Sequence, residues 1–360
     1  MSGQNPIKRI FDLYTSDLSY QEIERLIKRE ASEVYEFFKA DIPKPDQSKN
    51  KLIRGLIFIR SLFNAFILKL TPARRIFFLI SLLFFFVGYS QANSLYTFSA
   101  YLIAILLLAF ELADKLSVKG ELDVARKIQF DLIPKKSAGI QGFEVATYYE
   151  PAREVGGDYF DILETPDRTY IIIGDISGKG MAAALYMVRV QSILYSLIDI
   201  FTGVKEIMIN LKKYFSKNLR REFFLTLSIA SIEKDGRIVF ARAGHPPAYH
   251  FKSATKEFSV LNSTGMGIGL NDKGLFEQTL EEISFVPKRN DIIFFYSDGL
   301  TETMNIVKDL FGEDKVKRLI SSNCDKSAEE IKTALLKAAE NFRGSALQND
   351  DLTMVILKVV

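Results

Sequence analysis

The fold is predicted most directly by residues 156–180, which read GGDYFDILETPDRTYIIIGDISGKG. Two strand-like runs flank Pro166-Asp167, a pair of residues that favours a turn. In an antiparallel hairpin centred on this turn, Asp158 lies directly opposite Asp175. Both carboxylates then project from the same face of the sheet, with Cβ atoms about 5 Å apart.

Two bare carboxylates at that separation repel each other, and a bound cation removes the repulsion. A pair of solvated acids at strand ends is the ordinary interpretation, and a bulge in either strand would undo the pairing. Metal binding is favoured here because further acids stand at the ends of other strands. Asp161, an odd number of positions from Asp158, is predicted to point to the opposite face.

Two of these further acids border apolar, strand-like runs. Asp298 follows the run 292–296, and Asp350-Asp351 precede the run 352–359. Neighbours in a strand alternate faces, so only one of Asp350 and Asp351 can point at a shared site. Carboxylate oxygens without His or Cys partners are the ligands that Mg²⁺ and Mn²⁺ prefer, and such centres perform hydrolysis or phosphoryl chemistry.

Five short motifs occur in an order that resembles the PPM-type metal-dependent Ser/Thr phosphatases (the protein phosphatase 2C family), and most closely their bacterial SpoIIE-like branch. They are GGDYFD (156–161), GDISGKG (174–180), AGHPP (243–247), SDGLTE (297–302) and DDLT (350–353). The resemblance covers about residues 117–360. It implies an α+β fold in which two antiparallel β-sheets are sandwiched between helices, with metals at one end between the sheets.

The resemblance also implies two divalent cations, Mn²⁺ or Mg²⁺, that activate a water for attack on phosphoserine. Asp175 would bridge the ions, and Asp158 would bind the second ion directly or through water. Asp298 and Asp350 would complete the shell of the first ion. Asp350 is preferred to Asp351 for its spacing from the following threonine, and this choice stays open. The implied metal ligands are thus Asp158, Asp175, the backbone carbonyl of Ile176, Asp298 and Asp350.

Three nearby positions bear on catalysis. Ser177 stands where the eukaryotic branch has a His assigned to protonating the leaving group, so the general acid stays unassigned. Arg153 occupies the position of a phosphate-binding Arg in that branch, and a guanidinium suits phosphate; the alternative is an exposed loop Arg. His245 is predicted to brace a turn rather than to exchange protons.

A membrane segment is predicted between Arg75 and Glu111, where no charged residue occurs. The apolar runs Ile76–Tyr89 and Leu95–Phe110 are together too long for one span, and a polar stretch separates them. A tight hairpin of two short transmembrane helices is expected, with a re-entrant hairpin as the alternative. Basic residues on both flanks place both ends in the cytoplasm, as in a multi-pass protein of the inner (cytoplasmic) membrane.

The segments beside this hairpin predict further helices. Tyr20–Phe38 has amphipathic spacing, and Leu52–Leu70 mixes basic and apolar residues, as in an interfacial helix or one packed on a partner. Leu112–Ile133 predicts a linker helix, with Gly120 as a candidate hinge. In SpoIIE-like proteins such a helix is held to relay signals and to form a homodimer; the alternative is a helix packed on its own domain. Its predicted apolar face comprises Leu122, Ala125, Ile128 or Gln129, and Leu132.

Strand-like and helix-like runs occur in blocks after residue 142, which favours an α+β sandwich. The predicted strands are 143–149, 159–164, 169–175, 224–233, 238–243, 248–251, 291–297 and 352–359, and the predicted helices are 181–201, 204–219, 314–321 and 327–341. The predicted domains are an N-terminal cytoplasmic or interfacial helical segment (1–75), a transmembrane helical hairpin (76–112), a linker helix (113–135) and a PPM-type phosphatase domain (136–360).

The predicted function is that of a membrane-anchored, metal-dependent protein Ser/Thr phosphatase. By resemblance its substrate would be a phosphorylated anti-sigma-factor antagonist with a STAS domain. The alternative is a catalytically silent membrane receptor or scaffold, against which the acid at each expected metal position counts. A net charge of +3 gives no nucleic-acid signature, and the single cysteine, Cys324, excludes an internal disulfide framework.

Overall fold

The computed structural model describes residues 51–134, 139–217, 220, 222–270 and 274–360. The helix predicted at 20–38 therefore lies outside the described residues. The chain divides into two compact units, residues 1–116 and 117–360. Each unit is described by itself below.

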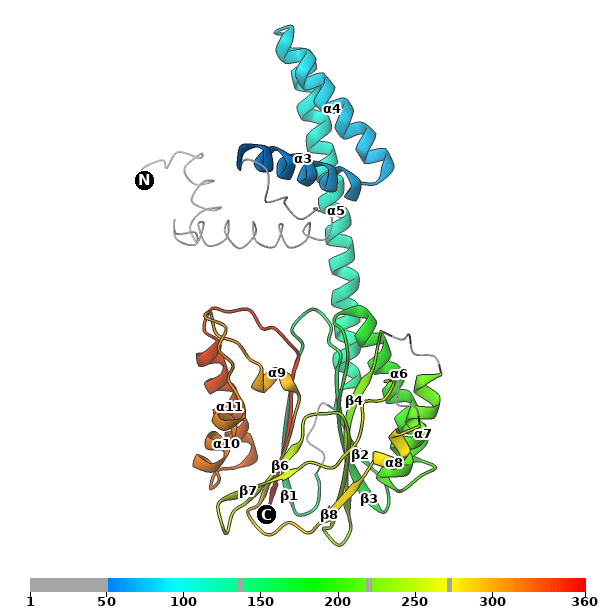
Figure 1. Cartoon of the computed structure of the whole chain (residues 1–360), viewed down its shortest axis with the longest axis vertical. Coiled ribbons are helices and arrows are strands. Elements are labelled where there is room, and N and C mark those ends of the chain that lie inside the picture. The colour runs from blue at the N-terminus through cyan, green and yellow to red at the C-terminus, as the bar shows by residue number, and fades with distance from the viewer. Residues whose placement is uncertain (1–50, 135–138, 218–219, 221, 271–273) are drawn as a thin grey trace, which may run out of the picture. The chain divides into compact units, whose positions relative to one another are not determined.

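The first unit contains a helical hairpin. Helix α3 (Lys51–Lys69) is followed by α4 (Pro72–Ser90) and by the first part of α5 (Ser94–Leu132) (Figure 1). Small residues let α4 and α5 approach closely. Ser81 Oγ donates a hydrogen bond to the carbonyl of Ala100 at 2.8 Å, and both residues are buried. The predicted helical hairpin is present, but its second helix is not short: α5 has 39 residues.

Helix α5 continues without a break from the hairpin through Gly120 to Leu132. The helix shows no break at Gly120, and a hinge there stays a prediction. One glycine costs a helix about 1 kcal/mol relative to alanine, and no proline accompanies it to remove a backbone donor. The linker helix and the second helix of the hairpin are therefore one element.

The second unit contains two five-stranded sheets whose neighbouring strands are all antiparallel. The strand orders are β1-β10-β9-β6-β7 and β2-β3-β4-β5-β8. The strands are β1 (Phe143–Glu150), β2 (Asp158–Glu164), β3 (Arg168–Ile176), β4 (Leu225–Glu233), β5 (Ile238–Ala243), β6 (Ala248–Lys252), β7 (Glu257–Leu261), β8 (Glu282–Phe285), β9 (Ile292–Tyr296) and β10 (Leu352–Val359).

Helices cover the outer faces of both sheets, as Figure 1 shows. Helices α6 (Met181–Ile198) and α7 (Val204–Ser216) pack on the sheet that contains β2 and β3, and α10 (Glu313–Ser322) and α11 (Ala328–Arg343) pack on the sheet that contains β10. The described part of the unit also contains the single-turn helices α8 (Phe276–Thr279) and α9 (Asp298–Thr301). The predicted α+β sandwich is confirmed.

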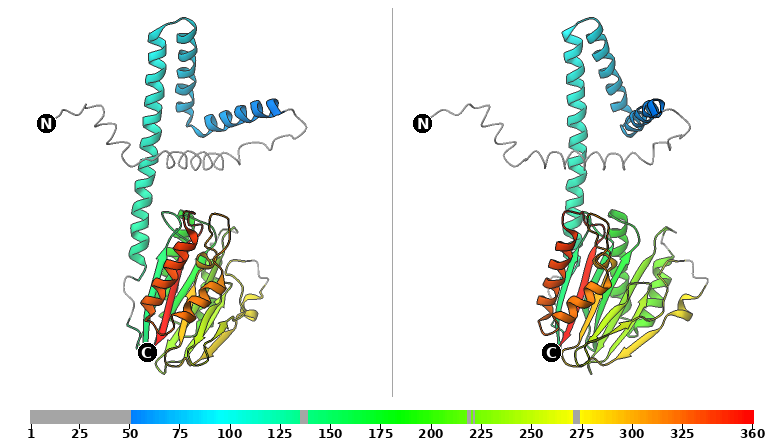
Figure 2. Two further views of the ribbon diagram at one scale, coloured as in Figure 1. Left: turned by 90° about the vertical axis from the view of Figure 1, so that its left-hand side faces the viewer. Right: turned by 60° about the vertical axis from the view of Figure 1, so that its left-hand side comes forward.

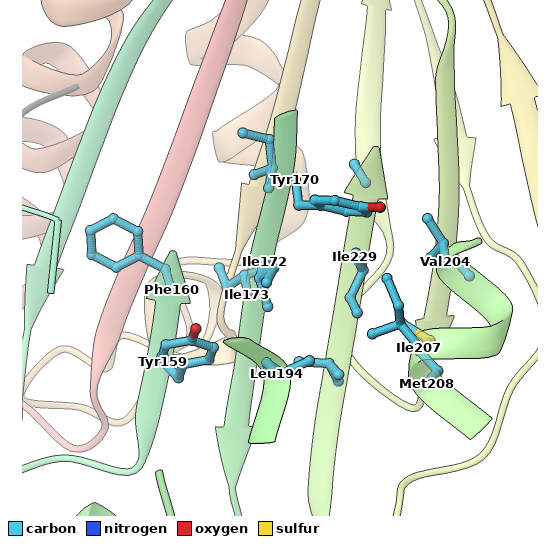
Figure 3. Close-up of a cluster of buried hydrophobic side chains, with 14 of the residues drawn as sticks. Tyr159, Phe160, Tyr170, Ile172, Ile173, Leu194, Val204, Ile207, Met208 and Ile229 are labelled. Carbon is cyan, nitrogen blue, oxygen red and sulfur yellow. The ribbon is translucent and has the colours of Figure 1, made fainter. Parts of the chain in front are cut away.

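Strand β9 illustrates why continuous apolar runs predicted this architecture. Ile293 and Phe295 belong to the core between the sheets, whereas Ile292, Phe294 and Tyr296 belong to the core beneath α10 and α11. Both faces of the strand are buried, so every position is apolar. Figure 3 shows the corresponding packing of β2, β3 and β4 against α6 and α7.

Among the residues that the structure describes, three helices are long and apolar enough to span a membrane by length and composition: α4, α5 and α6. They differ in how much of their surface is buried. The inner face of α6 is packed in the core, with Met187, Val190 and Leu194 fully buried. Its apolarity is therefore explained by the fold, and only α4 and α5 remain largely uncovered.

Candidate active site

The hairpin of β2 and β3 has the register predicted from the sequence. Asp158 pairs with Asp175, and the turn is closed by the amide of Thr165, which donates to the carbonyl of Arg168 at 2.9 Å. No bulge shifts the two acids, because each position from Asp158 to Glu164 has one partner. The expected opposition of the two carboxylates is confirmed.

Asp158 lies between the two sheets. Its side chain is 2% exposed, and it accepts a hydrogen bond from the hydroxyl of Thr353 on β10. Burial, followed by the nearby charges of Asp175 and Asp351, raises the pKa of Asp158 well above its ordinary value. This carboxylate is therefore strongly destabilised as a bare anion and gains from a compensating cation.

Asp175 and Asp298 have raised pKa values for the same reasons. Burial and the charges of Asp298 and Asp350 raise the pKa of Asp175 to about 8. Burial and the charge of Asp350 raise the pKa of Asp298 to about 6. The charges of Asp298 and Asp350 thus both act on Asp175, and that of Asp350 also acts on Asp298, which places the three carboxylates in one acidic cluster.

The adjacent acids Asp350 and Asp351 have different partners. Asp351 accepts backbone hydrogen bonds from Ala152 at 2.8 Å and Gly157 at 2.6 Å, and a longer one from Asp158 at 3.4 Å. Asp350 instead binds the ammonium of Lys179 at 2.8 Å and is partly exposed. Asp351 therefore fixes the loop 151–157, whereas Asp350 is held by Lys179. The charges of both raise the pKa of Asp175, so the choice between them as metal ligand stays open.

Backbone geometry brings the segments of the cluster together. Gly178 and Gly180 have φ values of +98° and +76°, which only glycine adopts readily, and they turn the chain from β3 into α6. A Cβ on Gly157 would lie 2.7 Å from the carbonyl oxygen of Ile176 and 3.2 Å from Asp175 Oδ1. The Ile176 carbonyl and the Asp175 carboxylate thus face the same space beside the β2 end.

The donor set fits hard divalent cations. It consists of carboxylate oxygens and the Ile176 carbonyl, with raised carboxyl pKa values that a cation would relieve. Within the part of the chain that the structure describes, no three Asp, Glu, His or Cys side chains are arranged to hold one ion. Mg²⁺ commonly keeps several waters and uses one or two carboxylates, so such a cage is not required.

The two histidines have structural positions. His245 is buried, and its Nδ1 lies 2.9 Å from the hydroxyl of Thr226, the residue opposite Asp175 on β4. Burial lowers the pKa of His245 to about 3, so the ring is neutral at ordinary pH. His250 lies on β6, and its Nε2 is 2.8 Å from a carboxylate oxygen of Asp291, the residue before β9. Both positions agree with bracing roles.

The structure shows a hydrogen-bond partner for the side chain of Ser177, whereas for Arg153 it shows only an exposed position. Ser177 Oγ accepts a hydrogen bond from the amide of Phe224 at 2.8 Å, so its side chain ties the β3 end to the start of β4. Arg153 is exposed on the loop 151–157 that Asp351 holds. Its role as a phosphate ligand stays a prediction.

Asp161 points to the opposite face of β2 from Asp158, as predicted. It is buried against α6, where its Oδ2 accepts from Tyr159 at 2.9 Å and Tyr195 at 2.8 Å. Gln191 adds a third donor at 3.3 Å. These hydroxyl and amide partners satisfy the carboxylate without a metal.

Gln129 of α5 makes a contact that sequence reasoning did not identify. Its side-chain amide donates to the carbonyl of Gly156 at 2.8 Å, and its amide oxygen accepts from the Gly156 N–H at 3.1 Å. The predicted apolar face left Ile128 and Gln129 as alternatives. Gln129 is buried and Ile128 is 56% exposed, so the polar residue faces the domain.

Comparisons with known proteins agree with this fold and with the order of the acidic motifs along the chain. A family model described as Stage II sporulation protein E (SpoIIE) matches residues 165–360. The chain belongs to the SpoIIE family. The phosphoserine phosphatase RsbU of Bacillus subtilis is 26% identical to this chain over 248 residues, which cover 67% of this chain and 70% of RsbU. The chain is a PP2C-type protein serine phosphatase.

Two solved structures show the same fold. The SiaA-PP2C domain of Pseudomonas aeruginosa has a TM-score of 0.62 at 18% identity, and the match covers 69% of this SpoIIE-family chain and 99% of that domain. The RsbU and RsbW domains of Rv1364c from Mycobacterium tuberculosis give a TM-score of 0.52 at 24% identity, with 61% of this chain and 60% of that one covered.

Proposed function

We propose that this phosphatase uses two Mn²⁺ or Mg²⁺ ions held by Asp158, Asp175, the Ile176 carbonyl, Asp298 and Asp350. The observation that carries the proposal is the register pair Asp158–Asp175, two carboxylates with raised pKa values inside one acidic cluster. When bound, such ions supply a nucleophilic water at neutral pH and neutralise phosphate charge.

The residues of the chain would divide the remaining work. Asp175 would bridge the ions, since it pairs in register with Asp158 and its pKa is raised by the charges of Asp298 and Asp350. Asp351 would keep the loop 151–157 in place through its backbone hydrogen bonds. Arg153, on that loop, would bind the phosphoryl group of the substrate with its guanidinium fork.

The substrate would be a phosphoserine or phosphothreonine protein, and specifically a phosphorylated anti-sigma-factor antagonist with a STAS domain. Two comparisons support this proposal. The relative RsbU is named a phosphoserine phosphatase, and in Rv1364c an RsbU domain shares a chain with an RsbW domain. A second copy of the chain would dimerise through α5, where Val124 and Ile128, four positions apart, are both exposed.

The hairpin of α4 and α5 would anchor the enzyme in the inner (cytoplasmic) membrane as a multi-pass protein with a cytoplasmic catalytic domain. Both helices expose large apolar side chains over most of their charge-free length, and such a surface fits a bilayer. Residues exposed in this way include Ile76, Phe77, Leu79, Leu83, Phe86, Leu95, Phe98, Ile105 and Leu108.

The metal proposal is tested with Asp175→Asn and the matched control Asp161→Asn, which changes a carboxylate on the opposite face of the same hairpin. Manganese-dependent hydrolysis of p-nitrophenyl phosphate and calorimetric Mn²⁺ titration are measured for both. Asp175→Asn should lose more than about 100-fold in activity, because removing a residue that merely orients a metal ligand already costs about 10–100-fold. Asp161→Asn should keep its Mn²⁺ affinity.

Equal losses in the two variants would contradict the assignment of Asp175 as bridging ligand. A wild-type protein that binds Mn²⁺ without hydrolysing any phosphate ester would instead support the silent receptor or scaffold. Thermal unfolding of each variant serves as the control for folding, because Asp161 is buried among hydrogen-bond partners.

A further inference from the structure

A cavity of about 460 Å³ lies in the first unit. Three helices form its walls, and each contributes residues three or four positions apart, which lie on one helical face. The lining residues are Phe66, Lys69 and Leu70 of α3, Arg74 and Phe78 of α4, and Ala104, Leu107, Leu108 and Glu111 of α5. The volume falls in the range of about 300–1,000 Å³ that small-molecule sites occupy.

The cavity has an apolar body and a charged end. Phe66 and Phe78 pack edge to face, with ring centroids 5.6 Å apart, and Ala104 with two leucines of α5 continues this wall. The charged end contains Lys69, Arg74 and Glu111. A site with one long apolar part and one charged part matches an amphiphile better than a uniformly polar or apolar ligand.

Ion pairs and hydrogen bonds between the helices hold the charged end of the cavity in place. Arg74 bridges α4 to α5 through Glu111 at 2.8 Å and Asp114 at 2.7 Å. The guanidinium of Arg75 donates to the carbonyls of Ile67, Leu68 and Leu70 at 2.8–3.1 Å, which closes the C-terminal end of α3.

These contacts hold the corner between α3 and α4, where α3 turns crosswise to α4 (Figure 2). The cavity wall formed by α3 is therefore fixed to the hairpin by polar contacts. Of the charged residues that line the cavity, Lys69 and Arg74 are cations and Glu111 is an acid, so the lining has one more positive than negative group and favours an anion.

We propose that this cavity binds an anionic lipid of the bilayer. One acyl chain lies between the phenylalanines and the leucines of α5, and the anionic headgroup lies at the end formed by Lys69 and Arg74. Basic pockets beside membrane helices on the cytoplasmic side recognise anionic headgroups in this way. The inference rests on the insertion of α4 and α5 into a bilayer that is proposed above, because that bilayer supplies the ligand.

The test uses the full chain in bilayer nanodiscs that contain equal parts of phosphatidylcholine and phosphatidylglycerol. Lipid that stays with the protein after release into detergent is counted by native mass spectrometry. Ala104→Phe fills the cavity and should lose most of the retained phosphatidylglycerol. The control Ile105→Phe changes the next residue of α5, which is exposed and does not line the cavity, and should retain lipid as the wild type does.

A second variant tests the headgroup. Lys69→Gln should weaken the preference for phosphatidylglycerol over phosphatidylcholine by about fivefold, the factor that corresponds to about 1 kcal/mol per basic group. Equal retention by wild type, Ala104→Phe and Ile105→Phe would overturn the site. Retention of both lipids without preference by the wild type would overturn its anionic selectivity.

Two controls separate this inference from the proposals on which it depends. Flotation of the wild type with liposomes measures membrane insertion, and a protein that stays in the bottom fraction contradicts the anchor itself. Manganese-dependent phosphatase activity of every variant reports that the catalytic unit is folded. Lipid loss in Ala104→Phe with flotation and activity intact assigns the effect to the cavity.

Discussion

Asp350 and Asp351 are neighbours in the chain, yet their side chains meet different partners. Asp351 accepts from two amides of the loop 151–157 and Asp350 binds Lys179. The alternation of faces at the start of a strand explains the division, because adjacent side chains point apart. The open choice between these two acids as metal ligand thus becomes a choice between two distinguishable mutant phenotypes.

We expect Asp351→Asn to lower the free energy of unfolding by about 1–3 kcal/mol, the usual cost of losing hydrogen bonds to a buried charged acceptor. Its Mn²⁺ affinity should fall less than that of Asp350→Asn, which should keep wild-type stability. Urea unfolding and Mn²⁺ calorimetry of both variants check this. A stable Asp351→Asn protein that has lost Mn²⁺ binding would transfer the ligand role to Asp351.

The raised pKa values of Asp175 and Asp298 predict how metal-free protein responds to pH. Their pKa values, about 8 and about 6, lie above those of exposed carboxyls, so the folded state holds protons that the unfolded chain releases. The resulting stabilisation is present at low pH and is lost as pH rises through about 6 and about 8. Mn²⁺ should reverse the loss, because it binds the ionised carboxylates.

Melting temperatures between pH 5 and 8.5, with EDTA and with Mn²⁺, test this expectation. In EDTA, Asp175→Asn should become more stable than wild type as pH rises, by several degrees, since about 1 kcal/mol corresponds to about 2–4 °C in a domain of this size. In Mn²⁺ the order should reverse. Parallel curves for the two proteins in EDTA would mean that Asp175 is not destabilised as a bare anion.

The positions of the acidic side chains in the site could be predicted from sequence to different extents. The pairing of Asp158 with Asp175 was predicted by counting residues outward from the turn, because a short turn without a bulge fixes the register. The contact between Lys179 and Asp350 joins residues 171 positions apart, and that between Gln129 and Gly156 joins residues 27 apart. Such contacts depend on the packing of separate elements, which no local pattern encodes.

Helix α5 shows the same limit for a longer segment. Its apolar spacing predicted one packed face but left Ile128 and Gln129 as alternatives; in the structure Leu122 is partly buried, Gln129 is buried and Ile128 is exposed. Likewise β7 and β8 were not predicted. Each is an edge strand of four or five residues with mixed polarity, because an edge strand packs less of its surface than a central one.

Substitutions at Leu122 and Ile128 distinguish a helix α5 that relays a signal from one that only packs on its own domain. Leu122→Glu should both destabilise the catalytic unit and change its activity, because a charge would enter a half-buried position. Ile128→Glu should leave the melting temperature unchanged and, if α5 pairs with a second copy, should shift the protein towards monomer and alter its rate. Light scattering and Mn²⁺-dependent kinetics at equal melting temperature check this. An Ile128→Glu protein with wild-type mass and rate contradicts pairing at this face.

The division of the chain at residue 116 gives the last prediction. Both hydrophobic cores of the catalytic unit are built entirely from residues after this boundary, so their packing does not require the hairpin. Residues 117–360 alone should therefore fold and keep the same Mn²⁺ requirement, whereas the full chain should float with liposomes.

If a membrane event is relayed along α5 by a shift between two states, the rate of the full chain should depend on bilayer composition. The truncated enzyme should not respond to added vesicles. Identical rates and identical metal dependence in every bilayer and in the truncated form would reduce α5 to a tether, while loss of all activity on truncation would show that the hairpin unit is needed to complete the catalytic fold.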